Sequence, residues 1–196
     1  SSSPEAATLD ATRITPRALV AVNMASHRLL GAESSLRSRT RWLALKDEIS
    51  RAAVVHLHVV HSYMARVEGL IDLLDELRKP VVWTLHDQWV LTGRCAQPGS
   101  CRGYLDGCEN CPDLQAYPPA TIDRAFVQHP ARRDMVSRLT RSERSELVPC
   151  ALWLEEDARA AGVLVGPAIQ NSVDPVFWES ISPVSRGPST GLRALF

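Results

Sequence analysis

The chain contains 196 residues, of which 45% are hydrophobic and 22% charged, and its 22 basic residues balance its 22 acidic residues. This length fits one domain with a fragment of a second, and a chain of this size can bury about 70% of its unfolded surface without a covalent staple. The zero net charge argues against a nucleic-acid binder and against a general electrostatic attraction to anionic membranes.

The N-terminal residues and the hydropathy pattern indicate a cytoplasmic protein. Ser1–Thr8 lacks the basic and apolar regions of a secretory signal peptide. No segment approaches the roughly 18 to 20 apolar residues of a membrane span. In a reducing compartment, closely spaced cysteines bind metals or take part in catalysis more often than they form disulfides.

The first fifty residues carry a weak pattern, and the pattern becomes sharper from Ala52. An apolar run at 18–22 predicts a short strand, and residues 25–50 are compatible with helix. The β-branched run 52–60 predicts a buried strand, because it is apolar on both faces at its start. Residues 65–79 then predict a helix with one apolar face, which Pro80 ends.

The next apolar run, Val81–Leu85, predicts a second buried strand. The strand, the helix and this second strand together predict a βαβ unit. Such a unit pairs its strands in parallel with a right-handed crossover. Later segments continue the alternation, with a helix over 121–139, a strand over 146–149, a helix over 152–161 and a short strand over 168–170. Pro130 is expected to interrupt the first of these helices, and Gly162 to close the second.

The chain therefore predicts an α/β fold, a Rossmann-like parallel sheet flanked by helices, over residues 1–180. Asn171–Asp174 is expected to form a turn. The serine, proline and glycine content of 180–191 is typical of a linker. Residues 181–196 are thus expected to be a linker and the first strand of a second, incomplete domain.

Polar residues follow the second predicted strand, at the edge where open α/β sheets bind ligands. His86 and Asp87 come directly after Leu85. A histidine at a strand end can donate a hydrogen bond to a charge that develops in a reaction, and Asp87 can orient it or accept a proton. The alternative is structural, with the histidine bonded internally and Asp87 capping a turn. A metal site formed by His56, His58 and His61 is disfavoured against buried or cleft-lining roles.

Four cysteines lie within the loop 93–112 that follows, with the spacing C-x5-C-x6-C-x2-C, and a fifth stands apart at Cys150. Only the last pair has the short spacing common in structural zinc sites. Three states remain open on this evidence: a zinc site, disulfides or free thiols, and an iron–sulfur cluster. In each of them the expected role is structural, shaping a pocket beside His86. The four candidate ligands are Cys95, Cys101, Cys108 and Cys111.

A succession of motifs covers about residues 52–180. In chain order they are HLH at 56–58, PVVWTLHDQW at 80–89, TGRC at 92–95, GCENCP at 107–112, VPCALWL at 148–154 and IQNSVD at 169–174. In this order they resemble the N-terminal acceptor domain of family 4 glycosyltransferases of the colanic-acid and exopolysaccharide branch.

The resemblance implies a GT-B enzyme, in which two Rossmann-like domains face each other across a cleft. The first domain binds the acceptor and the second binds the nucleotide sugar, and transfer retains the anomeric configuration. It implies that His86 contacts the donor sugar. Asp87, which follows it, is the second candidate catalytic residue on the chemistry given above. His58, Trp89 and Arg94 are the candidate acceptor-binding residues. The implied partners are a nucleotide sugar and a glycan, lipid-linked or small-molecule acceptor, and a lipid-linked acceptor would bring the protein to the membrane surface.

The chain departs from the family pattern at several positions. It has no Gly-Gly loop, and Cys150 and Ser172 replace the serine and glycine of two family motifs. The paired glutamates of the donor domain are absent, so we expect this chain to need a donor-binding domain for transfer. The alternative function is a non-catalytic module that binds a glycan or a partner protein. A zinc-knuckle nucleic-acid binder is a third class, which the neutral charge disfavours.

Overall fold

The structure is a computed structural model that describes residues 14–33, 36–61 and 63–172. Within these residues three strands form one sheet in the order β1-β2-β3. The strands are β1 (Val55–Leu57), β2 (Val81–Leu85) and β3 (Ser145–Pro149). Both pairs are parallel, with Val55 opposite Val81 and Trp83 opposite Leu147. The predicted α/β fold with a parallel sheet is therefore confirmed.

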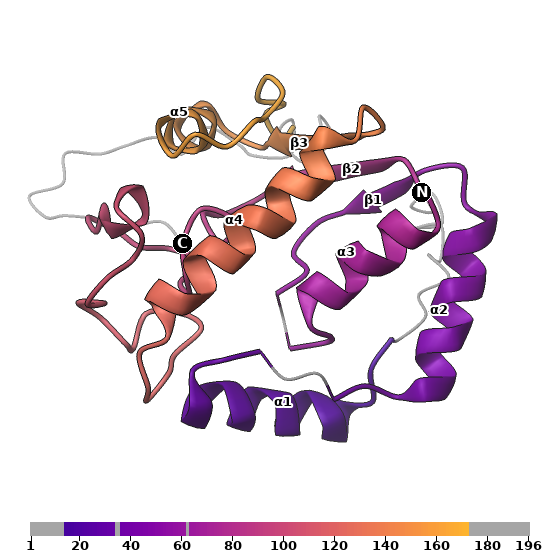
Figure 1. The fold of residues 1–196 in the computed structure, drawn as a ribbon, viewed down its shortest axis with the longest axis horizontal. Coiled ribbons are helices and arrows are strands. Elements are labelled where there is room, and N and C mark those ends of the chain that lie inside the picture. The colour runs from indigo at the N-terminus through magenta and orange to yellow at the C-terminus, as the bar shows by residue number, and fades with distance from the viewer. Residues whose placement is uncertain (1–13, 34–35, 62, 173–196) are drawn as a thin grey trace, which may run out of the picture.

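Five α-helices and one short 3-10 helix surround this sheet in the described part of the chain (Figure 1). They are α1 (Arg17–Leu30), α2 (Arg39–Arg51), α3 (Val67–Glu76), α4 (Ala125–Arg141), α5 (Leu152–Ala160) and η1 (Gly103–Leu105). Helices α3 and α4 pack against each other, α4 and α5 pack against β3, and α1 lies farther from the sheet (Figure 1). None of these helices is long and apolar enough to cross a membrane.

The hydrophobic core lies between the sheet and the helices that pack on it. The apolar residues in it follow the pattern seen in the sequence. In β2 alternate residues are buried, and Val81, Trp83 and Leu85 face the core. The predicted apolar stripe of α3 faces it too, with Ile71 and Leu74 almost fully buried. Burying each such side chain stabilises the fold by about 1.5 to 3 kcal/mol, so helix and strand hold each other in place.

Helix α4 runs through Pro130, where the sequence predicted an interruption. Proline removes one backbone hydrogen bond and costs about 3 kcal/mol in a helix interior. The buried residues Met135, Val136 and Leu139 continue the helical spacing beyond it. Their burial against the core outweighs the local loss, so the helix continues to Arg141.

Two predicted strands in the described residues are wrong, and one is shorter than expected. The run 18–22 belongs to α1, because its helix-compatible sequence continues to Gly31, whose φ of 67° ends the helix. Segment 168–170 only lies along β3, where the amides of Gly166 and Ile169 donate to the carbonyls of Leu147 and Pro149. The expected strand 52–60 is reduced to β1, since Val54 and Val59 are exposed.

The helix predicted over 152–161 is confirmed as α5, and Gly162 follows it with a φ of 68°. The predicted linker and final strand, residues 180–196, lie outside the described residues, as does the end of the turn at 171–174.

Replacing Leu74 by alanine tests the packing of α3 on the sheet. Leu74 is 1% exposed, so the cavity left behind should lower the free energy of unfolding by about 2 to 5 kcal/mol. Leu29→Ala is the matched control, because Leu29 lies on a helix but is 62% exposed and should change stability by less than about 0.5 kcal/mol. Urea unfolding of both variants measures the difference, and equal stabilities would contradict the packing described.

Candidate functional site

Two histidines meet at the carboxyl edge of the sheet. His58 follows β1 and His86 follows β2, and parallel pairing of these strands places both residues at the same edge. The distance between His58 Nδ1 and His86 Nε2 is 2.9 Å, and the two rings are stacked with centroids 5.2 Å apart. His58 is exposed and His86 is half-buried, so the pair is accessible to a ligand.

Asp87 bonds to neighbours other than His86. Its Oδ2 atom lies 2.8 Å from His61 Nε2, and its Oδ1 atom accepts a hydrogen bond from the backbone amide of Trp89. The sequence left two roles open for Asp87, to orient His86 or to cap a turn, and in the structure it bonds to His61 and to the amide of Trp89 in the turn. The carboxylate is mostly buried and the ring of His61 almost wholly so. This carboxylate is held in a fixed position before any ligand arrives.

Trp89 is buried, although the sequence placed it among the acceptor-binding residues. The side chain is 3% exposed. The guanidinium of Arg132 lies 3.5 Å from its ring centroid, and the ring of His61 is stacked on it at 5.4 Å. These neighbours lie against the indole, and Trp89 also lines the pocket described below, so its part in acceptor binding stays a prediction.

Arg94 is also internal. Its side chain is 1% exposed, and the guanidinium donates to the backbone carbonyls of Ala116, Pro118 and Asp113 and to the sulfur of Cys111. The sequence expected this guanidinium to meet an acceptor phosphate. Its contacts instead join the two ends of the loop that contains the cysteines.

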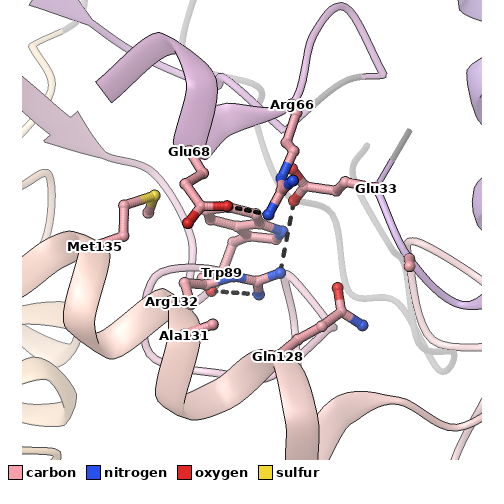
Figure 2. A pocket seen from close by; sticks show the side chains of 9 residues that line it. Glu33, Arg66, Glu68, Trp89, Gln128, Ala131, Arg132 and Met135 are labelled. Carbon is pink, nitrogen blue, oxygen red and sulfur yellow. Dashed lines mark hydrogen bonds and ion pairs between the residues drawn. The ribbon is translucent and has the colours of Figure 1, made fainter. Parts of the chain in front are cut away.

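A pocket of about 260 Å³ lies on the other side of Trp89, between the start of α3 and the first half of α4 (Figure 2). Glu33, Arg66, Glu68, Gln128 and Arg132 supply its polar groups. Arg66 pairs with Glu68, and Arg132 lies 3.7 Å from Glu33 (Figure 2). None of these residues was found from the sequence, because they belong to no motif and come from three separate segments.

Arg132, which lines this pocket, also bonds to the loop that follows β2. One guanidinium nitrogen donates to the carbonyls of Trp89 and Thr92, at 3.0 and 2.9 Å. Burial lowers the pKa of Arg132 to about 10, with Glu33 acting in the opposite direction, so the group stays charged at neutral pH. Two guanidinium groups therefore face two carboxylates in the pocket. The balanced charge suits a neutral ligand rich in hydroxyl groups better than a phosphate or an amine.

The four clustered cysteines line one small cavity of about 30 Å³. All four are half-buried free thiols. Burial raises the pKa of the Cys95 and Cys108 thiols. Among residues 14–33, 36–61 and 63–172, no group of three or more His, Cys, Asp or Glu side chains already stands in a metal-binding arrangement. The four predicted ligands therefore lie around one cavity, and metal binding by them stays a prediction.

The chain is similar to a protein of Escherichia coli (strain K12) named "Putative colanic acid biosynthesis glycosyl transferase WcaC". The two sequences are 39% identical over 129 residues, which is 62% of this chain and 31% of the relative. The chain thus spans less than a third of the relative's length. No protein-family model and no solved structure matches the chain. The relative's name agrees with the resemblance that the motifs indicate.

Replacing Arg132 by methionine tests its role as the support of this site. The carbonyls of Trp89 and Thr92 would lose their buried donor, so the free energy of unfolding should fall by about 2 to 4 kcal/mol. Arg138→Met on the same helix is the control. Its ion pairs with Asp72 and Asp134 are partly exposed, and their loss should cost less than about 1 kcal/mol. Urea unfolding of both variants decides between a buried support and an ordinary surface arginine.

Proposed function

We propose that this chain is the acceptor-side domain of a retaining glycosyltransferase, which transfers a sugar from a nucleotide-sugar donor to a glycan or lipid-linked acceptor. The observation that carries the proposal is the accessible His58–His86 pair at the carboxyl edge of a parallel sheet. Similarity to a protein named as a colanic acid glycosyl transferase supports the same activity class. The donor-binding domain of such an enzyme would have to face this edge.

His86 would act by donating a hydrogen bond to a donor-sugar hydroxyl or to the leaving phosphate. Its contact with His58 favours this role, because one nitrogen of the pair must donate and the other must accept. If His58 Nδ1 donates to His86 Nε2, the neutral His86 ring carries its proton on Nδ1. That proton can then be donated to a ligand, where it stabilises charge on the leaving group.

The acceptor would bind in the pocket beyond Trp89. Glu33, Glu68, Arg66 and Gln128 offer planar groups that form paired hydrogen bonds with neighbouring hydroxyls of a sugar ring. In this arrangement His58 would line the cleft between the two domains, and the buried Trp89 and Arg94 would support the pocket from within the fold. Asp87, held between His61 and Trp89, adds fixed negative charge near the reacting groups.

Replacing His86 by alanine, and assaying transfer with a donor-binding domain supplied on the same chain or by a partner, tests the catalytic role. Loss of one positioned donor should lower turnover by roughly 100- to 1,000-fold without unfolding the domain. The matched control is His129→Gln, since His129 lies on α4 and bonds to the backbone carbonyl of Tyr104 and not to the histidine pair. Near-normal turnover of the His86 variant would exclude this residue from the chemistry, and binding of a glycan without any sugar transfer would support a non-catalytic module.

Replacing Glu68 by glutamine tests the acceptor pocket separately. A hydrogen bond to a charged group contributes about 1.5 to 3 kcal/mol, so the Michaelis constant for the acceptor should rise by roughly tenfold or more while turnover changes little. Glu76→Gln is the control, because Glu76 lies on the same helix but pairs on the surface with Lys46. Steady-state kinetics with varied acceptor gives both constants, and unchanged values would place the acceptor elsewhere.

A further inference from the structure

The loop after β2 gathers four thiols from separate positions around one cavity. Cys95 lies near its start, Cys101 precedes η1, and Cys108 and Cys111 follow it. The volume of about 30 Å³ is enough for a single ion but small for a cluster that contains inorganic sulfide. The fifth cysteine, Cys150, follows β3 and does not line this cavity.

Hydrogen-bond donors are directed at three of the four sulfur atoms. The backbone amide of Gly93 lies 3.1 Å from the sulfur of Cys108, and that of Gly103 lies 3.4 Å from the sulfur of Cys101. The guanidinium of Arg94 lies 3.3 Å from the sulfur of Cys111. Donors in these positions can bond to the sulfur atoms of a metal-bound thiolate, which accepts hydrogen bonds more strongly than a disulfide does.

The backbone around Cys108 also has an unusual conformation. Gly107, Cys108 and Asn110 all have positive φ values, of 100°, 61° and 53°. This conformation costs free energy for residues other than glycine, and it persists where the surroundings enforce it. Turns of this kind direct successive amides into a concave surface that accepts negative charge.

We propose that Cys95, Cys101, Cys108 and Cys111 bind one structural zinc ion. Four thiolates form the closed tetrahedral set that zinc prefers, with sulfur about 2.3 Å from the metal. Binding releases the four thiol protons to solvent and involves no oxidation or reduction. The resulting site is negatively charged, and the buried guanidinium of Arg94 lies beside it to offset that charge. Zinc draws inward four thiols that already border the same cavity.

The zinc site would hold the segment that leads into the candidate active site. The carbonyl of Cys95 accepts a hydrogen bond from the hydroxyl of Thr92, and the carbonyl of Ala96 accepts one from the amide of Gln88. Gln88 directly follows Asp87. This inference does not depend on the proposed sugar transfer, since it rests on the thiols and their donors alone.

Elemental analysis of the purified chain, prepared with zinc and under reducing conditions, tests the proposal. One zinc per chain is expected. The chain with Co²⁺ in place of zinc should show the sulfur-to-cobalt charge-transfer absorption of a four-thiolate site. Without metal chelators, alkylation should modify Cys150 alone and leave the other four thiols protected. Absence of metal with four reactive thiols, two disulfides in the purified chain, or bound iron and sulfide would each overturn the proposal.

Serine variants locate the ligands. Cys108→Ser should lose the zinc or bind it at least tenfold more weakly, whereas the control Cys150→Ser should keep one zinc per chain. Equal zinc content in both would overturn the assignment. The wild-type cobalt spectrum and alkylation pattern remain decisive if Cys108→Ser fails to fold, because they need no variant.

Discussion

Parallel pairing of β2 between its two neighbours is the constraint on which the other features depend. Strands that run in one direction deliver their carboxyl ends to one edge, and every residue following them must share that edge. His58 and His86 are far apart in sequence, yet the register of β1 and β2 brings their rings into contact. An antiparallel arrangement would place the two histidines at opposite ends of the sheet, and no accessible pair would exist.

The second requirement is a buried positive charge. Burying the charge of Arg132 costs desolvation free energy, which its contacts must offset. It bonds to the carbonyls of Trp89 and Thr92 and stacks on the indole of Trp89. These carbonyls belong to irregular backbone, which no sheet or helix satisfies. A guanidinium has several donors in a fixed plane, so one side chain from α4 can satisfy a loop that a lysine could satisfy only in part.

The sequence predicted the features that repeat along the chain and missed those that join distant segments. The apolar periodicity of α3 marks its buried face, and the parallel pairing expected of the βαβ unit places His58 and His86 at one edge, whereas their contact was not predicted. The partnership of Glu33 with Arg132 has no local signal, because the two residues meet only through the tertiary fold. Trp89 shows the same limit of sequence analysis, because the local sequence after β2 does not reveal whether this tryptophan is exposed or covered.

Arg94 explains how this loop can be irregular and still position a site. Its guanidinium spans the carbonyls of Asp113, Ala116 and Pro118, so it fastens the far end of the loop to the residues just after β2. Ordering a backbone costs about 1 to 2 kcal/mol per residue, and a long loop without regular structure needs such anchors. Since Asp87 and Trp89 lie on the same segment, anchors that look remote from the chemistry determine where its side chains stand. Arg94, which the sequence assigned to the acceptor, is therefore an internal anchor of this loop.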